Sequence, residues 1–259
     1  GRCQIEAVWI VQNWLISALF IPVFLYVSVV VGMYLGQRKL IYRPDKTPVS
    51  VSEVRAIGAQ LVETSSADGV RTSHLYHPAG QGKPTVIVFH GNAGNIDDRL
   101  DKAQRFLAMN YGVVVVGYRG FGGNEGEPSE DGLYADARAA HAYLQDAGVE
   151  KDNIALYGES LGTGVASNMA AEGRGFALIL EAPFTSVANV AQDHYWYLPA
   201  GMLVHDRFDT LSRVADIDVP VLIMHGERDA VVPFSHGKRL ENAFNQEVRT
   251  HYVASAAHT

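Results

Sequence analysis

The chain has 259 residues, a formal net charge of −7, 47% hydrophobic residues and a single cysteine. This length suits one large domain or two small ones. The negative charge offers no basic patch for nucleic acid, so we expect no nucleic-acid partner. Because Cys3 has no second cysteine to pair with, a disulfide within the chain is excluded.

The first distinct feature is a segment without charged residues, which runs from Ala7 to Gln37. It is longer than the roughly 18 apolar residues that indicate a membrane span and the roughly 7 to 15 of a signal-peptide core. As a helix it would reach about 45 Å, so it would tilt, kink at Pro22 or run partly along the interface. We predict that residues 1–37 form a membrane anchor, with a buried or oligomerisation helix as the alternative.

Aromatic and basic residues flank this segment as they flank membrane spans. Trp9, Trp14 and Tyr34 fit the two interfacial belts in which tryptophan and tyrosine gather. Residues 38–48 are rich in Lys and Arg, and we predict that they form a basic juxtamembrane linker. By the positive-inside rule, the remainder of the chain would then lie on the cytoplasmic side of the membrane.

Residues 49–259 alternate short apolar runs with helical patterns, which predicts a single α/β domain. Apolar runs bounded by Gly or Pro are typical of strands buried on both faces. We expect an antiparallel hairpin, then a mostly parallel sheet with right-handed crossovers and helices on both faces. The expected strands are 59–65, 70–78, 85–91, 112–118, 153–160, 177–183, 220–226 and 249–255, and the expected helices are 98–110, 131–147, 234–245 and one that follows residue 160.

The stretch Gly158-Glu159-Ser160-Leu161-Gly162 has the pattern G-x-S-x-G where a strand is expected to give way to a helix. A nucleophile elbow requires this context, because the turn is too sharp for side chains on either side of the serine. The start of the helix also favours developing negative charge. The pattern alone is common by chance, but its position predicts that Ser160 is a nucleophile.

A serine hydroxyl needs a base to remove its proton, and the base needs a third group to fix its tautomer. Asp229 follows the expected strand 220–226, and His258 follows the last expected strand. Taken singly, the two could be a solvated loop carboxylate and a frayed terminal residue. The order Ser, acid, His is that of α/β-hydrolases, so we predict a catalytic triad. Glu181 is the competing candidate for the acid.

Two further sets of residues are expected to contact a substrate. An oxyanion hole must stabilise the charge of the tetrahedral intermediate, and the predicted donors are the backbone N–H groups of Leu161 and Asn92, with Ala93 as second choice. Residues 184–218 are predicted to form a short cap over the site, although plain packing on the sheet is the alternative. The cap residues that could line an acyl pocket are Tyr195, Trp196, Tyr197, Leu198, Met202 and Leu203.

Several motifs together resemble those of a known family. They are "LIYRP" (40–44), "HGNAGN" (90–95), "GYRGFGGNEGEPSEDG" (117–132), "YGESLGTG" (157–164), "EAPFTS" (181–186), "HGERDAVVP" (225–233) and "AAHT" (256–259). This set resembles the α/β-hydrolase superfamily, in particular the membrane-anchored serine hydrolases that include fungal bud-emergence-type proteins and protein-depalmitoylating thioesterases. The chain departs from that pattern at Gly117, where Asp is frequent, and at Asn124, where Ser is frequent. It also stops one residue after His258, where that family normally adds a closing helix.

The residues and the resemblance together predict a membrane-anchored serine hydrolase that cleaves carboxylic esters or thioesters through an acyl-enzyme on Ser160. The expected partners are a lipid or acyl-protein substrate and the lipid bilayer, and no metal or cofactor is expected. Within enzymes, the alternative is an amidase or peptidase. Outside enzymes, it is a catalytically idle α/β-hydrolase domain that serves as a membrane interaction module.

Overall fold

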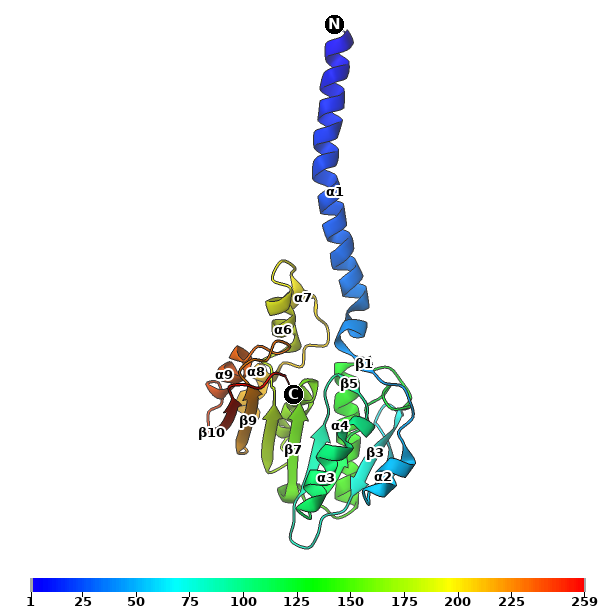
Figure 1. Cartoon of the computed structure of the whole chain (residues 1–259), viewed down its shortest axis with the longest axis vertical. Coiled ribbons are helices and arrows are strands. Elements are labelled where there is room, and N and C mark those ends of the chain that lie inside the picture. Colours follow the sequence, from blue (N-terminus) through cyan, green and yellow to red (C-terminus); the bar gives the residue numbers. More distant parts are fainter. Residues whose placement is uncertain (1, 259) are drawn as a thin grey trace. The chain divides into compact units, whose positions relative to one another are not determined.

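The computed structural model describes residues 2–258, and the side chains of residues 20–258. The predictions for Trp9 and Trp14 therefore lie outside the described side chains. The chain divides between Leu40 and Ile41 into two compact units (Figure 1). This division falls within the basic segment 38–48, whose role as a linker stays a prediction.

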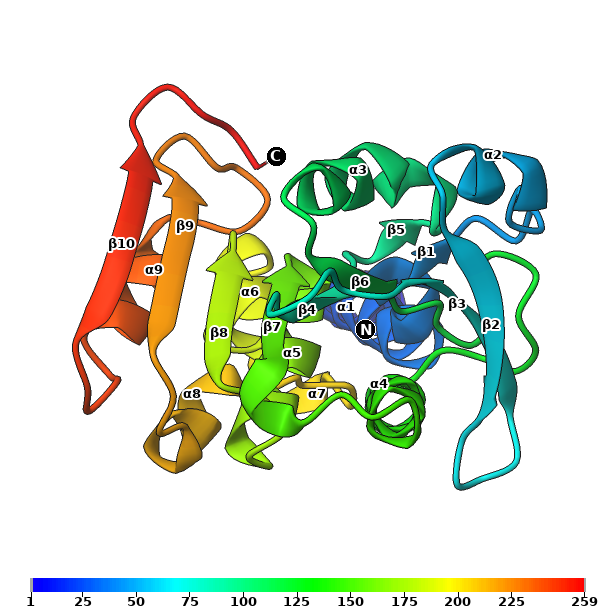
Figure 2. The same cartoon turned by 90° about the horizontal axis from the view of Figure 1, so that it is seen from below.

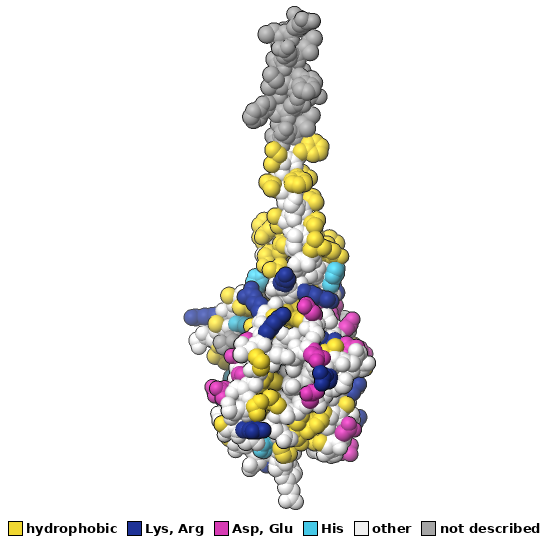
Figure 3. All heavy atoms as spheres, turned by 90° about the vertical axis from the view of Figure 1, so that its right-hand side faces the viewer, with side chains coloured by type: hydrophobic (Ala, Val, Ile, Leu, Met, Phe, Trp, Pro, Cys, Tyr) yellow, Lys and Arg dark blue, Asp and Glu magenta, His cyan; other side chains and the backbone are white. Residues whose placement is uncertain are grey.

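The first unit consists of the helix α1 (Arg2–Ile41), which continues through Pro22. Within its described part, Phe20–Ile41 is long and apolar enough to cross a membrane. Its large apolar side chains are exposed, as Figure 3 shows, and Leu35 is 78% exposed. A helix that exposes apolar side chains in this way is unfavourable in water, so the helix is compatible with the predicted anchor.

Within the described residues, the second unit is built on an eight-stranded sheet. Its strands are β2 (Gln60–Ser65), β3 (Arg71–His77), β4 (Thr85–Phe89), β6 (Gly112–Val115), β7 (Ile154–Glu159), β8 (Ala177–Glu181), β9 (Val221–Gly226) and β10 (Val248–Val253). The strand order is β10-β9-β8-β7-β4-β6-β3-β2. β3 pairs antiparallel with β2 and β6, and the other described pairs are parallel. The predicted hairpin and mostly parallel sheet are confirmed.

Helices cover both faces of this sheet. They are α2 (Val51–Ala56), α3 (Leu100–Ala108), α4 (Glu130–Asp146), α5 (Leu161–Ala171), α6 (Val187–His194), α7 (Ala200–Leu203), α8 (Thr210–Arg213) and α9 (Ser235–Glu241), with short 3-10 helices η1 (Asp97–Arg99), η2 (Lys151–Asn153) and η3 (Val214–Asp216). α2 and α3 lie on one face and α4 and α5 on the other (Figure 2). The predicted α/β-hydrolase architecture is therefore confirmed. Residues 184–218, predicted to be a cap, contain α6, α7, α8 and η3.

A small second sheet joins the start of this unit to the loop after β4. β1 (Arg43–Pro44) pairs in parallel with β5 (Ala93–Gly94). The N–H of Asp45 also donates to the carbonyl oxygen of Gly94 at 3.1 Å. The residues that directly follow Ile41 are thus hydrogen-bonded to a loop at the carboxyl end of the central sheet.

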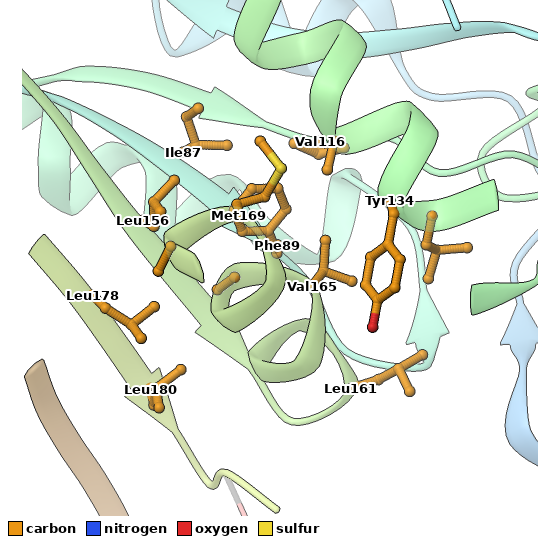
Figure 4. Close-up of a cluster of buried hydrophobic side chains, with 14 of the residues drawn as sticks. Ile87, Phe89, Val116, Tyr134, Leu156, Leu161, Val165, Met169, Leu178 and Leu180 are labelled. Carbon is orange, nitrogen blue, oxygen red and sulfur yellow. The ribbon is translucent and has the colours of Figure 1, made fainter. Parts of the chain in front are cut away.

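The central strands build a hydrophobic core on each face of the sheet. Ile87 and Phe89 belong to the core under α4 and α5, whereas Val86 and Val88 belong to the core under α2 and α3. Because side chains alternate along a strand, β4 is buried at every position. Val165 of α5 packs into the first of these cores (Figure 4). The two cores hold the carboxyl ends of the strands, and the loops that follow them, in fixed positions.

α5 approaches β4 so closely that there is no room for a side chain at Gly162. A Cβ atom there would lie 1.9 Å from the carbonyl oxygen of Phe89. The second glycine of the G-x-S-x-G pattern is therefore required by helix-to-strand packing as well as by the turn.

We expect Gly162→Ala to destabilise the fold, because the added methyl group must push α5 away from β4. Overpacking of this kind costs about 1–3 kcal/mol, which lowers Tm by roughly 3–10 °C in a domain of this size. Gly91→Ala is the control, because a Cβ at Gly91 would lie 3.6 Å from its nearest neighbours. Thermal unfolding followed by circular dichroism measures both, and equal Tm values for the two variants would contradict the packing argument.

Candidate active site

The predicted nucleophile lies on a strained turn between β7 and α5. Ser160 has φ 50° and ψ −116°, a backbone conformation that costs a non-glycine residue on the order of 1–3 kcal/mol. A Cβ at Gly158 would lie 2.5 Å from the carbonyl oxygen of Gly162, so this glycine too is required for space. The N–H of Ser160 donates to the carbonyl oxygen of Glu181 at 2.9 Å, which ties the turn to the end of β8.

The three residues of the predicted triad lie in hydrogen-bond contact. His258 Nε2 is 2.9 Å from Ser160 Oγ, and His258 Nδ1 is 2.7 Å from Asp229 Oδ2. Because a carboxylate accepts, the proton of a neutral imidazole belongs on Nδ1, and Nε2 is left to accept the serine proton. The sheet thus brings together the chain of groups that a general-base mechanism needs. The catalytic roles themselves stay predictions.

The carboxylate of Asp229 is buried and heavily hydrogen-bonded. Burial by itself would raise its pKa, but hydrogen bonds from His225, from His258 and from the Val232 N–H outweigh burial and hold the pKa below its usual range. The N–H groups of Val231 and Val232 both donate to Oδ1 at 2.8 Å. Asp229 therefore stays ionised at neutral pH, as a group that stabilises an imidazolium must.

Glu181, the competing acid, has other partners. Its Oε2 lies 2.6 Å from Lys102 Nζ and accepts a hydrogen bond from the Tyr157 hydroxyl. Burial and the nearby Glu181 carboxylate raise the pKa of Tyr157, so that this hydroxyl stays protonated and donates. These contacts favour Asp229 over Glu181 as the group that orients His258.

An ion network beside the elbow was missed by the sequence analysis. Glu159, which precedes Ser160, pairs with Arg99 Nη2 at 2.8 Å and with Lys102 Nζ at 2.6 Å. Lys102 also bridges to Glu181, so two carboxylates at the ends of neighbouring strands share one ammonium group. The network joins η1 and α3 to both sides of the elbow. Its cations come from a helical stretch with no distinctive pattern, so the sequence held no signal for them.

The predicted oxyanion donors lie on two segments that the sheet brings together. Leu161 is the first residue of α5, and the N–H groups of a first helical turn have no partner within the helix. The loop after β4 passes beside the nucleophile, since the Cβ position of Gly91 lies 3.6 Å from Ser160 Cβ. Asn92 follows directly, and Ala93 begins β5. The roles of Leu161, Asn92 and Ala93 as donors stay predictions.

The residues that follow Ile41 hold this loop in place. The side-chain amide of Asn92 donates to the carbonyl oxygen of Ile41 at 2.8 Å, and the N–H of Arg43 donates to the carbonyl oxygen of Asn92 at 2.8 Å. Together with the pairing of β1 and β5, these contacts hold both the side chain and the backbone carbonyl group of Asn92. The position of a predicted oxyanion donor therefore depends on a segment that lies 51 residues earlier in the chain.

The six cap residues expected to line an acyl pocket differ widely in exposure. Leu198 is 5% exposed and packs inside, whereas Trp196 is 78% and Met202 82% exposed. Tyr195 and Tyr197 are partly exposed and pack edge to face, and Leu203 is half-buried. The role of these six residues in substrate binding stays a prediction. Trp196 and Met202 point into solvent, whereas Leu198 is buried.

The cap is attached to the loop that carries Asp229. His194 Nε2, at the end of α6, donates to the carbonyl oxygen of Val231 at 2.8 Å. The neighbouring Asp193 carboxylate lies 3.0 Å from His236 Nε2, and burial lowers the pKa of His236. α6 therefore contacts the loop after β9 at Val231 and the helix α9 at His236. Among the side chains described, no group of three or more His, Cys, Asp or Glu residues is placed to hold a metal ion.

Comparison with known proteins also indicates a hydrolase of the α/β-hydrolase fold. The family profile described as "Serine aminopeptidase, S33" matches residues 80–205. An uncharacterized protein of Mycobacterium tuberculosis is 38% identical over 235 residues, covering 89% of this chain and 83% of that protein. The lysophosphatidylserine lipase ABHD12 of Danio rerio is 38% identical over 177 residues, covering 61% of this chain and 46% of the lipase.

Solved structures show the same fold. An esterase of Pyrococcus furiosus, Pf2001, is 18% identical and superposes with a TM-score of 0.68, covering 84% of this chain and 90% of the esterase. The elbow, the sheet and these similarities define a hydrolase of the α/β class. The chain belongs to the α/β-hydrolase family, as its motifs predicted.

We expect Asp229→Asn to lower turnover by about 10⁴, because an amide cannot hold the His258 tautomer that accepts the serine proton. Glu181→Gln is the matched control, since it makes the same change at a carboxylate that contacts Lys102 and not His258. Steady-state hydrolysis of a nitrophenyl ester by each purified variant measures the effect. A large loss in Glu181→Gln with little loss in Asp229→Asn would reverse our assignment of the acid.

Proposed function

We propose that this protein is a membrane-anchored serine hydrolase that cleaves carboxylic esters or thioesters of lipid or acyl-protein substrates. The observation that carries the proposal is the line of hydrogen bonds from Ser160 Oγ through His258 to Asp229, with contacts of 2.9 and 2.7 Å at a strained elbow. The similarity to a lysophosphatidylserine lipase supports an ester of a membrane lipid as one substrate class. The exposed apolar helix Phe20–Ile41 supports the anchor.

In the proposed mechanism, His258 Nε2 removes the proton of Ser160 as the serine oxygen attacks the acyl carbon. The backbone N–H groups of Leu161 and Asn92 stabilise the oxyanion of the tetrahedral intermediate. The protonated His258 then gives its proton to the leaving alcohol or thiol, and an acyl-enzyme remains on Ser160. Water, deprotonated by the same histidine, attacks the acyl-enzyme and releases the acid. Asp229 orients the ring and stabilises its charged form throughout.

A peptidase or amidase is the second candidate, because the matching family profile carries the description of a serine aminopeptidase. The same triad would serve, with an amine as the leaving group. Activity on aminoacyl amides alongside acyl esters separates the two candidates. A catalytically idle membrane module is less consistent with three residues in hydrogen-bond contact at an elbow, since strain of this kind is usually retained for function.

We expect Ser160→Ala to abolish labelling by a fluorophosphonate probe and to lower ester hydrolysis by roughly 10⁴ to 10⁶. Stability should change little, because the substitution removes one hydroxyl. Gel fluorescence after labelling and hydrolysis of nitrophenyl esters of graded chain length measure the two effects. Residual turnover above a few per cent of wild type would exclude Ser160 as the nucleophile.

A pair of shortened chains tests the anchor separately from the site. A chain that begins at Leu40 keeps β1, whereas one that begins at Lys46 lacks the strand that pairs with β5. We expect the first to hydrolyse a short soluble ester at nearly wild-type kcat/KM. It should lose most activity on acyl substrates in liposomes, because tethering raises the effective concentration of a membrane substrate.

The shorter chain should also lose activity on the soluble ester. Without β1 the Asn92 loop is released, and misplacement of a catalytic group by about 1 Å can cost roughly 10²-fold in rate. Equal kcat/KM of the two shortened chains on the soluble ester would refute a role for β1 in holding the oxyanion loop. Loss of all soluble activity in the Leu40 chain would instead show that α1 belongs to the folded domain.

A further inference from the structure

The tip of the cap carries the most exposed large apolar side chains in the second unit as far as its residues are described. Trp196 and Met202 are 78% and 82% exposed, and the nearby Tyr197 and Tyr195 are 54% and 37% exposed. α6 and α7, which bracket these residues, project from the carboxyl end of the sheet (Figure 1). Exposed apolar residues scattered singly are ordinary, but four within eight positions mark an interaction surface.

We propose that this aromatic tip, Tyr195, Trp196, Tyr197 and Met202, inserts into the interface of a lipid bilayer as a second membrane contact beside the α1 anchor. The inference rests on the proposed membrane anchoring and deepens it. It assigns the tip a lipid surface as its partner, and it makes the bilayer contact a property of the catalytic unit as well as of α1.

The chemistry of the tip fits the headgroup region. Indole and phenol rings combine an apolar body with one polar group, and for this reason they collect where hydrocarbon meets water. The rings of Trp196 and Tyr197 pack edge to face with centroids 5.7 Å apart, so they form a single apolar body. The exposed Arg207 lies at the Met202 end of the tip, because its Nη1 donates to the carbonyl oxygen of the preceding residue, Gly201, at 3.0 Å. A guanidinium at the rim of an apolar surface complements anionic lipid headgroups.

Chain connectivity holds the tip near the bilayer. Tyr42 directly follows Ile41, the last residue of the candidate span. Its hydroxyl donates to Asp206 Oδ2 at 3.0 Å, and its ring packs edge to face on Phe208 at 6.5 Å. Asp206 is four residues from Met202, and four residues extend over at most about 14 Å. The base of the cap is thus bonded to the point where the anchor ends, so the tip lies within reach of the membrane surface.

The proposed membrane contact of the tip also concerns the loop that carries Asp229. The side chain of Val231, 54% exposed, adjoins the cap because His194 of α6 bonds to its carbonyl oxygen. Its N–H donates to the catalytic acid candidate, Asp229. Insertion of the tip would therefore place the loop of the triad next to the lipid from which an acyl substrate comes.

The test uses Trp196 as its own reporter. The chain contains three tryptophans, and the double substitution Trp9→Phe and Trp14→Phe leaves Trp196 as the one tryptophan of the 259 residues. This protein is reconstituted in vesicles of phosphatidylcholine and phosphatidylglycerol whose acyl chains carry bromine at defined depths. Interfacial groups sit about 5–10 Å into the headgroup and acyl boundary, so we expect bromine near that depth to quench most of the emission and the emission maximum to move to shorter wavelength.

A matched control moves the reporter to another exposed apolar position. Met109, 46% exposed, follows α3 and precedes β6, so it lies at the amino end of the sheet, opposite the cap. The variant with Met109→Trp and Trp196→Phe in the same background should show no quenching. Adding Ser160→Ala to the Trp196 protein should leave its quenching unchanged, because insertion does not require catalysis. A failure of the catalytic proposal is therefore distinguishable from a failure of this one.

The remaining outcomes each decide the question. Flotation of the vesicles reports anchoring independently. Protein that floats with the vesicles while Trp196 keeps the unquenched emission of an indole in water overturns the insertion of the tip and leaves the anchor standing. Protein that does not float overturns both. If bromine quenches both Trp196 and the tryptophan of Met109→Trp, the protein adsorbs to lipid without a specific contact. If the emission moves to shorter wavelength without quenching and the shift depends on protein concentration, a second copy of the chain covers the tip. Either result rejects the proposal.

Discussion

The catalytic arrangement depends on one steric constraint, the space at the elbow between β7 and α5. A Cβ at Gly162 would collide with the carbonyl oxygen of Phe89, and one at Gly158 would collide with that of Gly162. Gly162 permits the close approach of α5 to β4 and Gly158 permits the tight turn itself, and within this turn Ser160 has a positive φ. Because the two cores on either side of the sheet are tightly buried, the surrounding structure holds this strained turn in place.

A second dependence joins the residues that directly follow α1 to the candidate active site. The residues from Ile41 to Asp45 bond to the loop of Asn92 on one side and, through Tyr42, to Asp206 in the cap segment on the other. One short stretch therefore supports both a predicted oxyanion donor and the surface that we propose to enter the bilayer. This arrangement gives the residues that follow α1 a structural role within the second unit, whether or not α1 is the proposed anchor.

Sequence patterns alone were enough to predict the fold class, which the structure confirms, and to select the three residues of the candidate triad. Strands such as β4, buried at all positions, are short apolar runs between glycine and proline, and local patterning of this kind reflects local burial. In a parallel sheet the carboxyl ends of the strands meet at one edge, so Ser160, Asp229 and His258, each placed after a strand, were bound to lie near one another. Their order along the chain then suggested which role each residue would have, and these roles stay predictions.

Only the tertiary structure decided which side chains pair across that edge. Glu181 looked like a possible acid in the sequence, and its ion pair with Lys102 of α3 depends on how that helix packs on the sheet. Gly117 and Asn124, two departures from the resembled family, lie together: a Cβ at Gly117 would lie 2.1 Å from the carbonyl oxygen of Ser73 and 2.9 Å from Asn124 Nδ2. The outward position of Trp196 likewise followed from the turn after α6. Sequence periodicity reports whether a position is buried, whereas partners depend on strand register and helix packing, which residues far apart in the chain set together.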